Sequence, residues 1–364
     1  MTTPFCAAPF NRVFVLSNGT FRNCCQTSPP IVSNSSNWDN WWNHDSELNN
    51  FRQKLLTKQD FPASCNTCKI QENVSGNSFR TALNQTYSAK SYPAEWSVMV
   101  GNICNLACWH CTEEFSSRIE ADKRKLNILP KNYISPTAQF EQHWPQLKNH
   151  IVSSLDHHDQ ITLSLLGGEP TYNKLVKDFL FWLYDNNLSP RIKLEITTNG
   201  TKNSNLQDIL KKEFWQHIYM AISIDAIGKK AEWLRYGCSW NDIDNNINFY
   251  KNYSSYVELH LTVSILNLKD LPAVYDYAQS KNIKLIVNTL NYPDFFSIEH
   301  WDGPDLELDK QAFVERGLGS YVDLLKLNPH HGNFELAKTY IQQLSVNRKP
   351  LLDFDEDLYQ ILFK

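Results

Sequence analysis

From about residue 96 to about residue 303, short apolar runs alternate with longer stretches in which apolar positions recur every three or four residues. This alternation is typical of βα units, in which each strand of a parallel sheet is followed by a helix. The apolar runs predict strands at Trp96–Gly101, Gln160–Leu166, Lys193–Thr197, Tyr219–Ile224, Val257–Val263 and Lys284–Thr289. The periodic stretches predict helices at Ala138–Leu155, Lys174–Asn186, Leu206–Phe214, Trp240–Tyr250 and Leu271–Lys281. Six such units predict an α/β protein with a partial (β/α)6 TIM-like barrel.

The first 90 residues lack this alternation. Val13–Phe21 predicts a hairpin, and its Asn18-Gly19 pair suits a turn with positive φ at both central positions. We therefore expect a small cysteine-rich hairpin module at residues 1–90, the barrel at 91–303 and a helical extension at 304–364. The best helical segments of the extension are Tyr321–Leu327 and Phe334–Leu344, and we see no site chemistry there.

Composition narrows the class of protein. With 364 residues, 42% of them hydrophobic, the chain can bury one large core and a smaller one. The formal net charge of -4 does not favour nucleic acid as a partner, because phosphate binding needs a basic surface. No apolar run is long enough to span a membrane, and the start MTTPFCAAPF does not resemble a signal peptide. We therefore expect a soluble, cytoplasmic protein without a membrane partner.

The nine cysteines point to metal or redox chemistry, because the cytosol keeps thiols reduced and does not favour disulfides. They form two groups and one isolated residue. The first group is Cys6, Cys24, Cys25, Cys65 and Cys68, and the second is Cys104, Cys108 and Cys111. Cys238 stands alone and is best interpreted as a small buried hydrophobic residue.

Polar or glycine-rich segments follow the first four predicted barrel strands. They are Cys104, Leu166–Pro170, Thr197–Gly200 and Ser223–Asp225, in chain order. Because the loops after barrel strands meet at one rim, we expect these segments to form a single pocket. Simpler interpretations stay open: Gly167-Gly168 and Thr197–Gly200 as ordinary turns, and Asp225 as a helix cap.

Three thiolates leave one iron of a four-iron cluster open for a substrate or cofactor. The spacing Cys104-x3-Cys108-x2-Cys111 resembles the signature of the radical S-adenosylmethionine superfamily. The resemblance implies a [4Fe-4S] cluster whose open iron is chelated by S-adenosylmethionine. It also implies reductive cleavage to a 5′-deoxyadenosyl radical, which takes a hydrogen atom from the substrate. A zinc knuckle is the alternative for the cysteines alone.

Further motifs match the same family. Gly167-Gly168-Glu169-Pro170 resembles its GGE motif, which implies that Gly167, Gly168 and Glu169 receive the methionine ammonium group. By the same resemblance, Thr198, Asn199, Ser223 and Asp225 hold the carboxylate and ribose. His110 takes a position that is usually aromatic and packs near adenine.

The N-terminal cysteines resemble the auxiliary-cluster modules called SPASM or twitch domains, although those commonly follow the barrel. The resemblance implies an auxiliary [4Fe-4S] cluster held by Cys6, Cys24, Cys65 and Cys68. Cys24 and Cys25 compete for one position, and the spacing from Gly19 favours Cys24, with Cys25 as a packing residue. A structural zinc site with four thiolates stays open.

The family resemblance predicts a radical S-adenosylmethionine enzyme that acts on a peptide or protein side chain. It also implies a reducing electron donor such as flavodoxin or ferredoxin. Two other classes compete: an enzyme of the same superfamily acting on a small molecule or nucleotide, and a non-catalytic zinc or iron-sulfur protein. The sequence identifies no catalytic residue on the substrate side.

Overall fold

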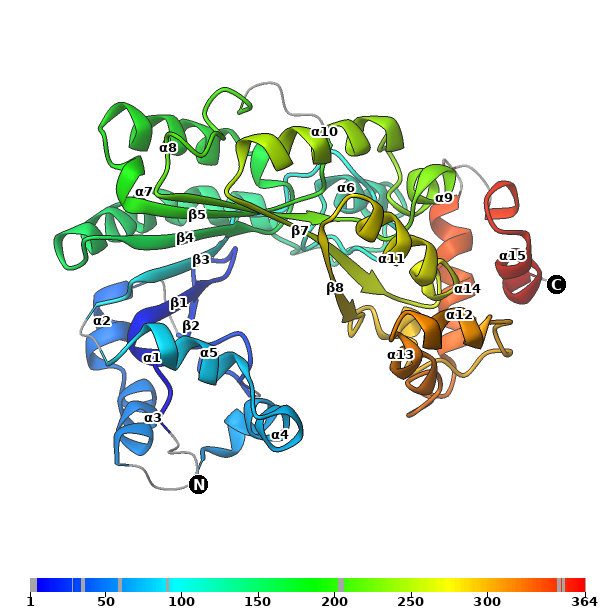
Figure 1. Cartoon of the computed structure of the whole chain (residues 1–364), viewed down its shortest axis with the longest axis horizontal. Coiled ribbons are helices and arrows are strands. Elements are labelled where there is room, and N and C mark those ends of the chain that lie inside the picture. The colour runs from blue at the N-terminus through cyan, green and yellow to red at the C-terminus, as the bar shows by residue number, and fades with distance from the viewer. Residues whose placement is uncertain are drawn as a thin grey trace. The chain divides into compact units, whose positions relative to one another are not determined.

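A computed structural model describes residues 5–27, 29–33, 37–57, 61–89, 92–201, 206–345, 348 and 351–363. The chain divides into two compact units. Unit 1 comprises Met1–Gly101, Ile134–Ile196 and Glu213–His217, and unit 2 comprises Asn102–Tyr133, Thr197–Lys212 and Ile218–Lys364. Each unit is described by itself below, with the element labels of Figure 1.

The sheet of unit 1 has the strand order β2-β1-β3-β4-β5. Its strands are β1 (Arg12–Val15), β2 (Phe21–Arg22), β3 (Glu95–Met99), β4 (Ile161–Leu166) and β5 (Ile192–Thr198). The strands β1, β3, β4 and β5 are parallel, whereas β2 pairs antiparallel with β1. The N-terminal hairpin therefore extends the parallel sheet through the pairing of β1 with β3.

Four helices of unit 1 begin at a polar side chain that accepts a hydrogen bond from a free backbone N–H. Asn37, Asp45, Ser78 and Asn173 cap α2, α3, α5 and α8 in this way. The helices are α1 (Ala8–Asn11), α2 (Trp38–His44), α3 (Ser46–Leu56), α4 (Asn66–Ser75), α5 (Phe79–Thr86), α7 (Pro136–Ser153) and α8 (Lys174–Asp185). Figure 1 shows α7 and α8 beside β4 and β5, and their apolar faces are buried.

Three parallel strands form the sheet of unit 2, in the order β6-β7-β8. They are β6 (His217–Ser223), β7 (Tyr256–Val263) and β8 (Lys284–Thr289). Alternate positions of β7 differ in character, because Leu259, Leu261 and Val263 are fully buried whereas His260 and Thr262 are only partly buried. This alternation is typical of a sheet with one apolar face.

The helices of unit 2 are α6 (Ser117–Lys125), α9 (Gly228–Leu234), α10 (Trp240–Tyr253), α11 (Leu271–Ser280), α12 (Lys310–Glu315), α13 (Gly319–Asp323), α14 (Asn333–Leu344) and α15 (Glu356–Phe363). Short 3-10 turns occur in both units, at Ala63–Cys65, Ser154–Asp156, Pro170–Tyr172, Ser189–Arg191, Leu268–Asp270, Asp294–Phe296 and Leu351–Asp353. No helix among the described residues is both long and apolar enough to cross a membrane.

The structure confirms the mixed α/β class and all six predicted barrel strands. Four of the five helices predicted between them are also present. The predicted helix Leu206–Phe214 is wrong: this stretch forms turns, and the Lys212 N–H donates to the Tyr253 carbonyl at 2.7 Å. A tertiary hydrogen bond thus replaces the one that a helix would make.

Two further local predictions need correction. The hairpin is present, but only Gly19 of its turn has a positive φ, +79°, because Asn18 accepts from the Thr20 N–H in a local side-chain turn. The helix predicted at Tyr321–Leu327 is wrong beyond Asp323. Lys326 adopts a φ of +64° and donates its N–H to the Ile298 carbonyl, which a continuous helix does not allow.

Candidate functional site

The GGE segment of unit 1 is a tight turn after β4. Gly167 and Gly168 have φ values of +83° and +45°. A Cβ on Gly167 would lie 3.2 Å from the Gly101 carbonyl oxygen and 3.4 Å from the Met99 Cα. Glycine is therefore required at position 167 both by the left-handed backbone and by the close approach of β3.

Glu169 is fully buried beside this turn, and its Oε1 accepts from the Thr171 N–H at 3.2 Å and the Thr171 hydroxyl at 2.6 Å. Asn173 stabilises the next turn through two side-chain hydrogen bonds. Its Oδ1 caps α8 through the Leu175 N–H, and its Nδ2 donates to the Val100 carbonyl at 2.7 Å. A buried, oriented carboxylate of this kind can receive a cationic group of a ligand.

The cysteine loop, residues 104–111, lies in unit 2 and is fastened along its backbone. The Ala107 and Trp109 N–H groups donate to the carbonyls of Tyr236 and Leu234, both at 2.9 Å. Burial raises the pKa of the Cys111 thiol well above its usual value, and the neighbouring thiols Cys108 and Cys104 add to this effect. The Cys111 N–H also donates to the Cys108 carbonyl at 3.1 Å, which places these two cysteines in one turn of the loop.

Asn199 connects the cysteine loop to the residues that follow β5. Its Nδ2 donates to Asn105 Oδ1 at 2.8 Å and lies 3.7 Å from the Cys104 sulfur, while its Oδ1 accepts from the Thr201 N–H. Thr198, one residue earlier, accepts from the Gly200 N–H at 3.2 Å through its hydroxyl. Asn199 is thus placed beside the first predicted cluster ligand, Cys104, and Thr198 directly precedes Asn199 in the chain.

A buried ion cluster follows β6. Asp225 Oδ2 lies 2.5 Å from the Arg235 guanidinium and 3.3 Å from His110 Nε2, and its Oδ1 accepts from the Thr262 N–H at 3.1 Å. Burial alone raises the pKa of Asp225, but His110 and Arg235 together hold it well below its usual value. Asp225 is therefore an ionised acceptor within hydrogen-bonding range of the cysteine loop and not a helix cap, since α9 begins without a side-chain cap.

Ser223, the last residue of β6, pairs in register with His260 of β7. Both are partly buried on the side of the sheet that also carries Glu258. Within unit 2 the cysteine loop thus contacts Asn199, and its His110 contacts Asp225. Ser223 lies two residues before Asp225, and Thr198 lies directly before Asn199. Gly167, Gly168 and Glu169 belong to unit 1.

Four N-terminal thiols of unit 1 line one small cavity: Cys6, Cys24, Cys65 and Cys68. Cys65 and Cys68 share one face because they lie three residues apart where a 3-10 turn runs into α4. Cys25 does not line the cavity, and its side chain is exposed. Cys24 is therefore the member of the Cys24-Cys25 pair that lies with the other three thiols.

A buried arginine supports this N-terminal thiol cavity. Arg80 lines it, pairs with Glu72 and donates to the Phe5 carbonyl at 2.6 Å, next to Cys6. Burial raises the pKa of Cys6 to about 12 and that of Cys65 to about 11. Because metals bind thiolates, loading this site would release protons.

Sequence reasoning did not single out Arg235 or Asn267, which complete the ion cluster. Asn267 is fully buried and donates to the carbonyls of Asp225 and Thr262 at 2.9 Å and 3.0 Å. A signal for Arg235 was present, because a charged residue directly follows the apolar end of a short helix, Trp233-Leu234. No local signal marks Asn267.

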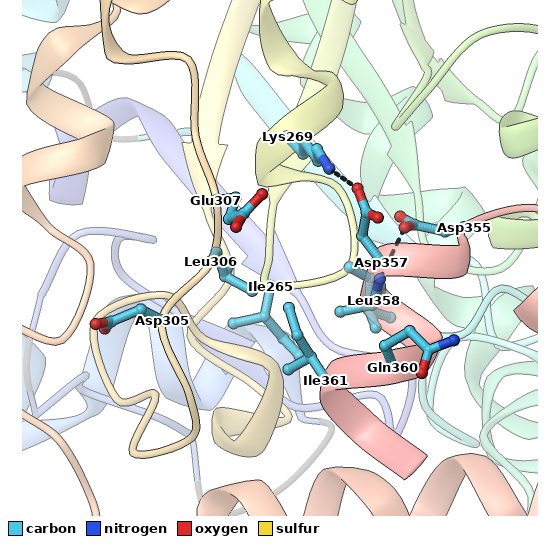
Figure 2. A pocket seen from close by; sticks show the side chains of 11 residues that line it. Ile265, Lys269, Asp305, Leu306, Glu307, Asp355, Asp357, Leu358, Gln360 and Ile361 are labelled. Carbon is cyan, nitrogen blue, oxygen red and sulfur yellow. Dashed lines mark hydrogen bonds and ion pairs between the residues drawn. The ribbon is translucent and has the colours of Figure 1, made fainter. Parts of the chain in front are cut away.

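A cavity of about 270 Å³ in unit 2 is separate from these residues (Figure 2). Ile265, Leu306 and Ile361 contribute apolar lining, and Lys269 pairs with Asp357 beside them. None of the residues predicted to bind a cofactor or metal lines it. We therefore assign the candidate site to the cysteine loop and the ion cluster.

The donor chemistry is compatible with iron-sulfur clusters. Among the described residues, no three or more His, Cys, Asp or Glu side chains are grouped to hold one metal ion. In a four-iron cluster, however, each cysteine binds a different iron, so its ligands surround a volume. The cysteine loop offers three thiols and the N-terminal thiol cavity four, which is compatible with this requirement.

Solved structures show a weak likeness to the chain. Native anSMEcpe with bound AdoMet is 16% identical, over 62% of this chain and 59% of that chain, with a TM-score of 0.41. Streptococcus suis SuiB bound to precursor peptide SuiA is 13% identical, over 99% of this chain and 88% of that chain, with a TM-score of 0.41. TYW1 with a lysine-pyruvate adduct is 12% identical, over 78% and 90%, with a TM-score of 0.36.

The chain thus spans less than two thirds of the length of anSMEcpe. No family model and no curated protein matches the sequence. Because the TM-scores are low, we base the function on this chain's own residues.

Proposed function

We propose that this chain is a radical S-adenosylmethionine enzyme. Cys104, Cys108 and Cys111 would hold a [4Fe-4S] cluster, and the fourth iron would be left to S-adenosylmethionine. The proposed cofactor residues are His110, Gly167, Gly168, Glu169, Thr198, Asn199, Ser223 and Asp225. The chemistry that these groups supply when bound is reductive cleavage of S-adenosylmethionine and abstraction of a hydrogen atom from the substrate.

The observation that carries this proposal is the surroundings of the cysteine loop. The Cys104 sulfur lies 3.7 Å from the amide of Asn199, and His110 of the same loop lies 3.3 Å from the ionised carboxylate of Asp225. Asn199 and Asp225 follow two successive strands of the chain, β5 and β6. A structural metal site needs four protein ligands and no such polar groups, whereas a catalytic site leaves one position for an external ligand. The polar side chains supply the contacts that such a ligand needs.

Each residue has a distinct task in this proposal. Glu169 would accept the ammonium group, because it is a fully buried carboxylate with a fixed orientation. Asp225 accepts from Arg235 and holds His110, so it would orient the ring beside the cofactor. Arg235 would offset the negative charge of thiolate ligands, since it lies close enough to Cys108 for their charges to interact.

The four thiols of the N-terminal cavity would hold an auxiliary [4Fe-4S] cluster of the twitch type. Four ligands would leave no iron open, which favours electron transfer over substrate binding. We further propose a peptide or protein side chain as substrate, with a small molecule or nucleotide as the alternative, and a donor such as flavodoxin or ferredoxin.

The test is S-adenosylmethionine cleavage by anaerobically purified protein with a chemical reductant. The wild type should form 5′-deoxyadenosine, and the Cys104→Ala, Cys108→Ala, Cys111→Ala triple variant should form none while it keeps the iron of the N-terminal cavity. Cys238→Ala is the matched control and should retain formation. Continued formation by the triple variant, or zinc in place of iron in the wild type, would contradict the proposal.

A further inference from the structure

The cysteine loop is held by two residues of the C-terminal region, a region in which the sequence showed no site chemistry. Arg348 donates from its guanidinium to the Ala107 carbonyl at 3.0 Å. The Tyr340 hydroxyl, on α14, donates to the Cys111 carbonyl at 3.3 Å. One contact therefore lies immediately before Cys108 and the other at Cys111 itself.

Arg348 is enclosed on every side that the structure describes. Its side chain is 1% exposed, and its second amino group donates to Asp122 of α6 at 3.1 Å. The guanidinium carbon lies 4.4 Å from the Trp109 ring centre and 5.3 Å from that of Tyr236. Trp109 belongs to the cysteine loop, and the Tyr236 carbonyl accepts the Ala107 N–H of the same loop. The planar guanidinium of Arg348 therefore contacts both the loop and the residue to which the loop is hydrogen-bonded.

The charge of Arg348 acts at the same place. Arg348 lies beside Cys108, because its guanidinium donates to the carbonyl of the preceding residue, Ala107, and packs on the ring of the next residue, Trp109. Arg235 is a second buried cation near the loop, since its partner Asp225 also contacts His110. Arg235 is compensated by Asp225, which is 2% exposed, whereas the carboxylate that compensates Arg348, Asp122, is 29% exposed and so more strongly screened. Adding an electron to a thiolate-bound cluster increases its negative charge, and a nearby buried cation makes that step easier.

From these contacts we propose that Arg348, assisted by Tyr340, is a positioning residue that holds the cysteine loop in shape and raises the reduction potential of the cluster bound there. This inference rests on the proposed function, because it needs a cluster at Cys104, Cys108 and Cys111. It assigns the C-terminal region a direct part in that site.

Three variants separate the effect of Arg348 on the geometry of the cysteine loop from the effect of its charge. Arg348→Lys keeps the positive charge but loses the two-pronged hydrogen bonding and the planar stacking of the guanidinium. Arg348→Gln loses the charge as well as these contacts. Tyr340→Phe loses one hydrogen bond. Arg316 supplies the matched control, because its guanidinium also binds a carboxylate, Asp276, and a backbone carbonyl, Ala312, away from the cysteine loop. The controls are Arg316→Lys and Arg316→Gln.

Two readouts apply to the full chain after anaerobic reconstitution, with the N-terminal cysteines replaced so that one cluster is observed. The first is the rate at which cluster absorbance is lost in the presence of an iron chelator. The second is the midpoint potential from a redox titration followed by electron paramagnetic resonance.

Arg348→Lys should lose its cluster at least about fivefold faster than the parent, with little change in potential, because one buried hydrogen bond and the stacking are lost. Arg348→Gln should lose it at least as fast and show a more negative potential. Tyr340→Phe should lose it moderately faster at an unchanged potential. Both Arg316 variants should match the parent.

The inference is overturned if both Arg348 variants match the parent in cluster loss and potential. It is also overturned if the Arg316 variants change these quantities as much as the Arg348 variants do. Tyr340→Phe gives an independent test if an Arg348 variant fails to fold, since a rate equal to the parent's contradicts the shared role. A parent protein that binds no iron at Cys104, Cys108 and Cys111 refutes the proposed function instead.

Discussion

At the scale of single residues, a fully buried carboxylate of unit 2, Asp225, and a partly buried one, Asp270, behave in opposite ways. Asp225 is held ionised by His110 and Arg235 despite its burial. Asp270 is compensated more weakly: among the described residues its Oδ2 has no hydrogen-bond partner, and Lys230 is 3.8 Å away and also paired with Asp355. Burial therefore raises the pKa of Asp270 to about 6. Partners, and not burial alone, decide the charge of each group.

Replacing Asp225 by Asn should destabilise the protein strongly. Asn has the same size but leaves the Arg235 charge buried without a carboxylate, so the free energy of unfolding should fall by about 3–5 kcal/mol. Urea unfolding under anaerobic conditions measures this. The matched control is Asp178→Asn, which removes an exposed pair with Lys174 and should change stability by less than about 0.5 kcal/mol. Equal effects of the two substitutions would contradict the role of Asp225.

The Asp270→Asn variant should be more stable than the wild type near neutral pH. The folded-state pKa of Asp270, about 6, lies above its ordinary value of 3.8, so folding favours the protonated carboxyl. Below about pH 4 the ionisation of Asp270 does not change the free energy of unfolding, and as the pH rises from about 4 to about 6 it lowers that free energy. The variant should therefore gain about 1–2 kcal/mol over the wild type between pH 4 and pH 7, allowing for partial screening.

Urea unfolding of the Asp270→Asn variant and the wild type at both pH values measures this gain. A difference that does not grow between pH 4 and pH 7 would show that Asp270 ionises freely in the folded state.

At the scale of elements, the turn between β4 and the Pro170–Tyr172 3-10 turn depends on its glycines. Gly167 needs both a left-handed backbone and space beside the Gly101 carbonyl. Gly76, which ends α4 with a φ of +73°, needs only the left-handed backbone, because no atom of the described residues lies within 4 Å of the position that a Cβ would take. The two glycines therefore separate backbone strain from crowding.

Gly167→Ala should cost more stability than Gly76→Ala. The left-handed conformation alone costs a non-glycine residue about 1–2 kcal/mol, and this is the loss expected for Gly76→Ala. Gly167→Ala adds crowding against β3 and should lose about 3 kcal/mol or more. Thermal unfolding of both variants measures the difference. Equal losses would mean that β3 moves aside at little cost.

At the scale of the whole molecule, residues far apart in the chain converge on the cysteine loop. The contacts of Ala107 with Tyr236 and Arg348, and of Cys111 with Tyr340, all join segments separated by more than 100 residues. Such contacts form only when the whole of unit 2 has folded. The proposed cluster site is therefore a product of the unit and not of the loop alone.

Iron analysis of cysteine variants tests the proposed division into two cluster sites. The wild type should hold about eight irons, four in each cluster. Replacing Cys104, Cys108 and Cys111 by Ala should leave about four irons, and so should replacing Cys6, Cys24, Cys65 and Cys68. Cys25→Ala should leave the iron content unchanged, because Cys25 does not line the N-terminal cavity. Loss of iron in the Cys25→Ala variant would show that Cys25, and not Cys24, is the cluster ligand.

The strands and the helices α7, α8, α10, α11 and α14 could be predicted from the sequence because apolar periodicity is a local property, whereas the N-terminal helices α1 to α5 were not predicted. Lys284–Thr289 matches its predicted bounds, and Trp240–Tyr250 is extended by only three residues. The same holds for the cysteine motif, whose spacing is a feature of eleven consecutive residues, 101–111. The predictions that were wrong, at Asn18, Leu206–Phe214 and Tyr321–Leu327, concern segments whose backbone groups bond to a side chain or to a distant carbonyl.

Local pattern and residue type are enough to derive the mixed α/β class, the strand positions and the residues that carry thiol and carboxylate chemistry. Folding is needed to show that Arg235 and Asn267 complete the environment of Asp225, and that Arg348 and Tyr340 bind the cysteine loop. The physical reason is that a buried charge or hydrogen-bonding group acquires its function from its partners, and these lie far from it in the chain.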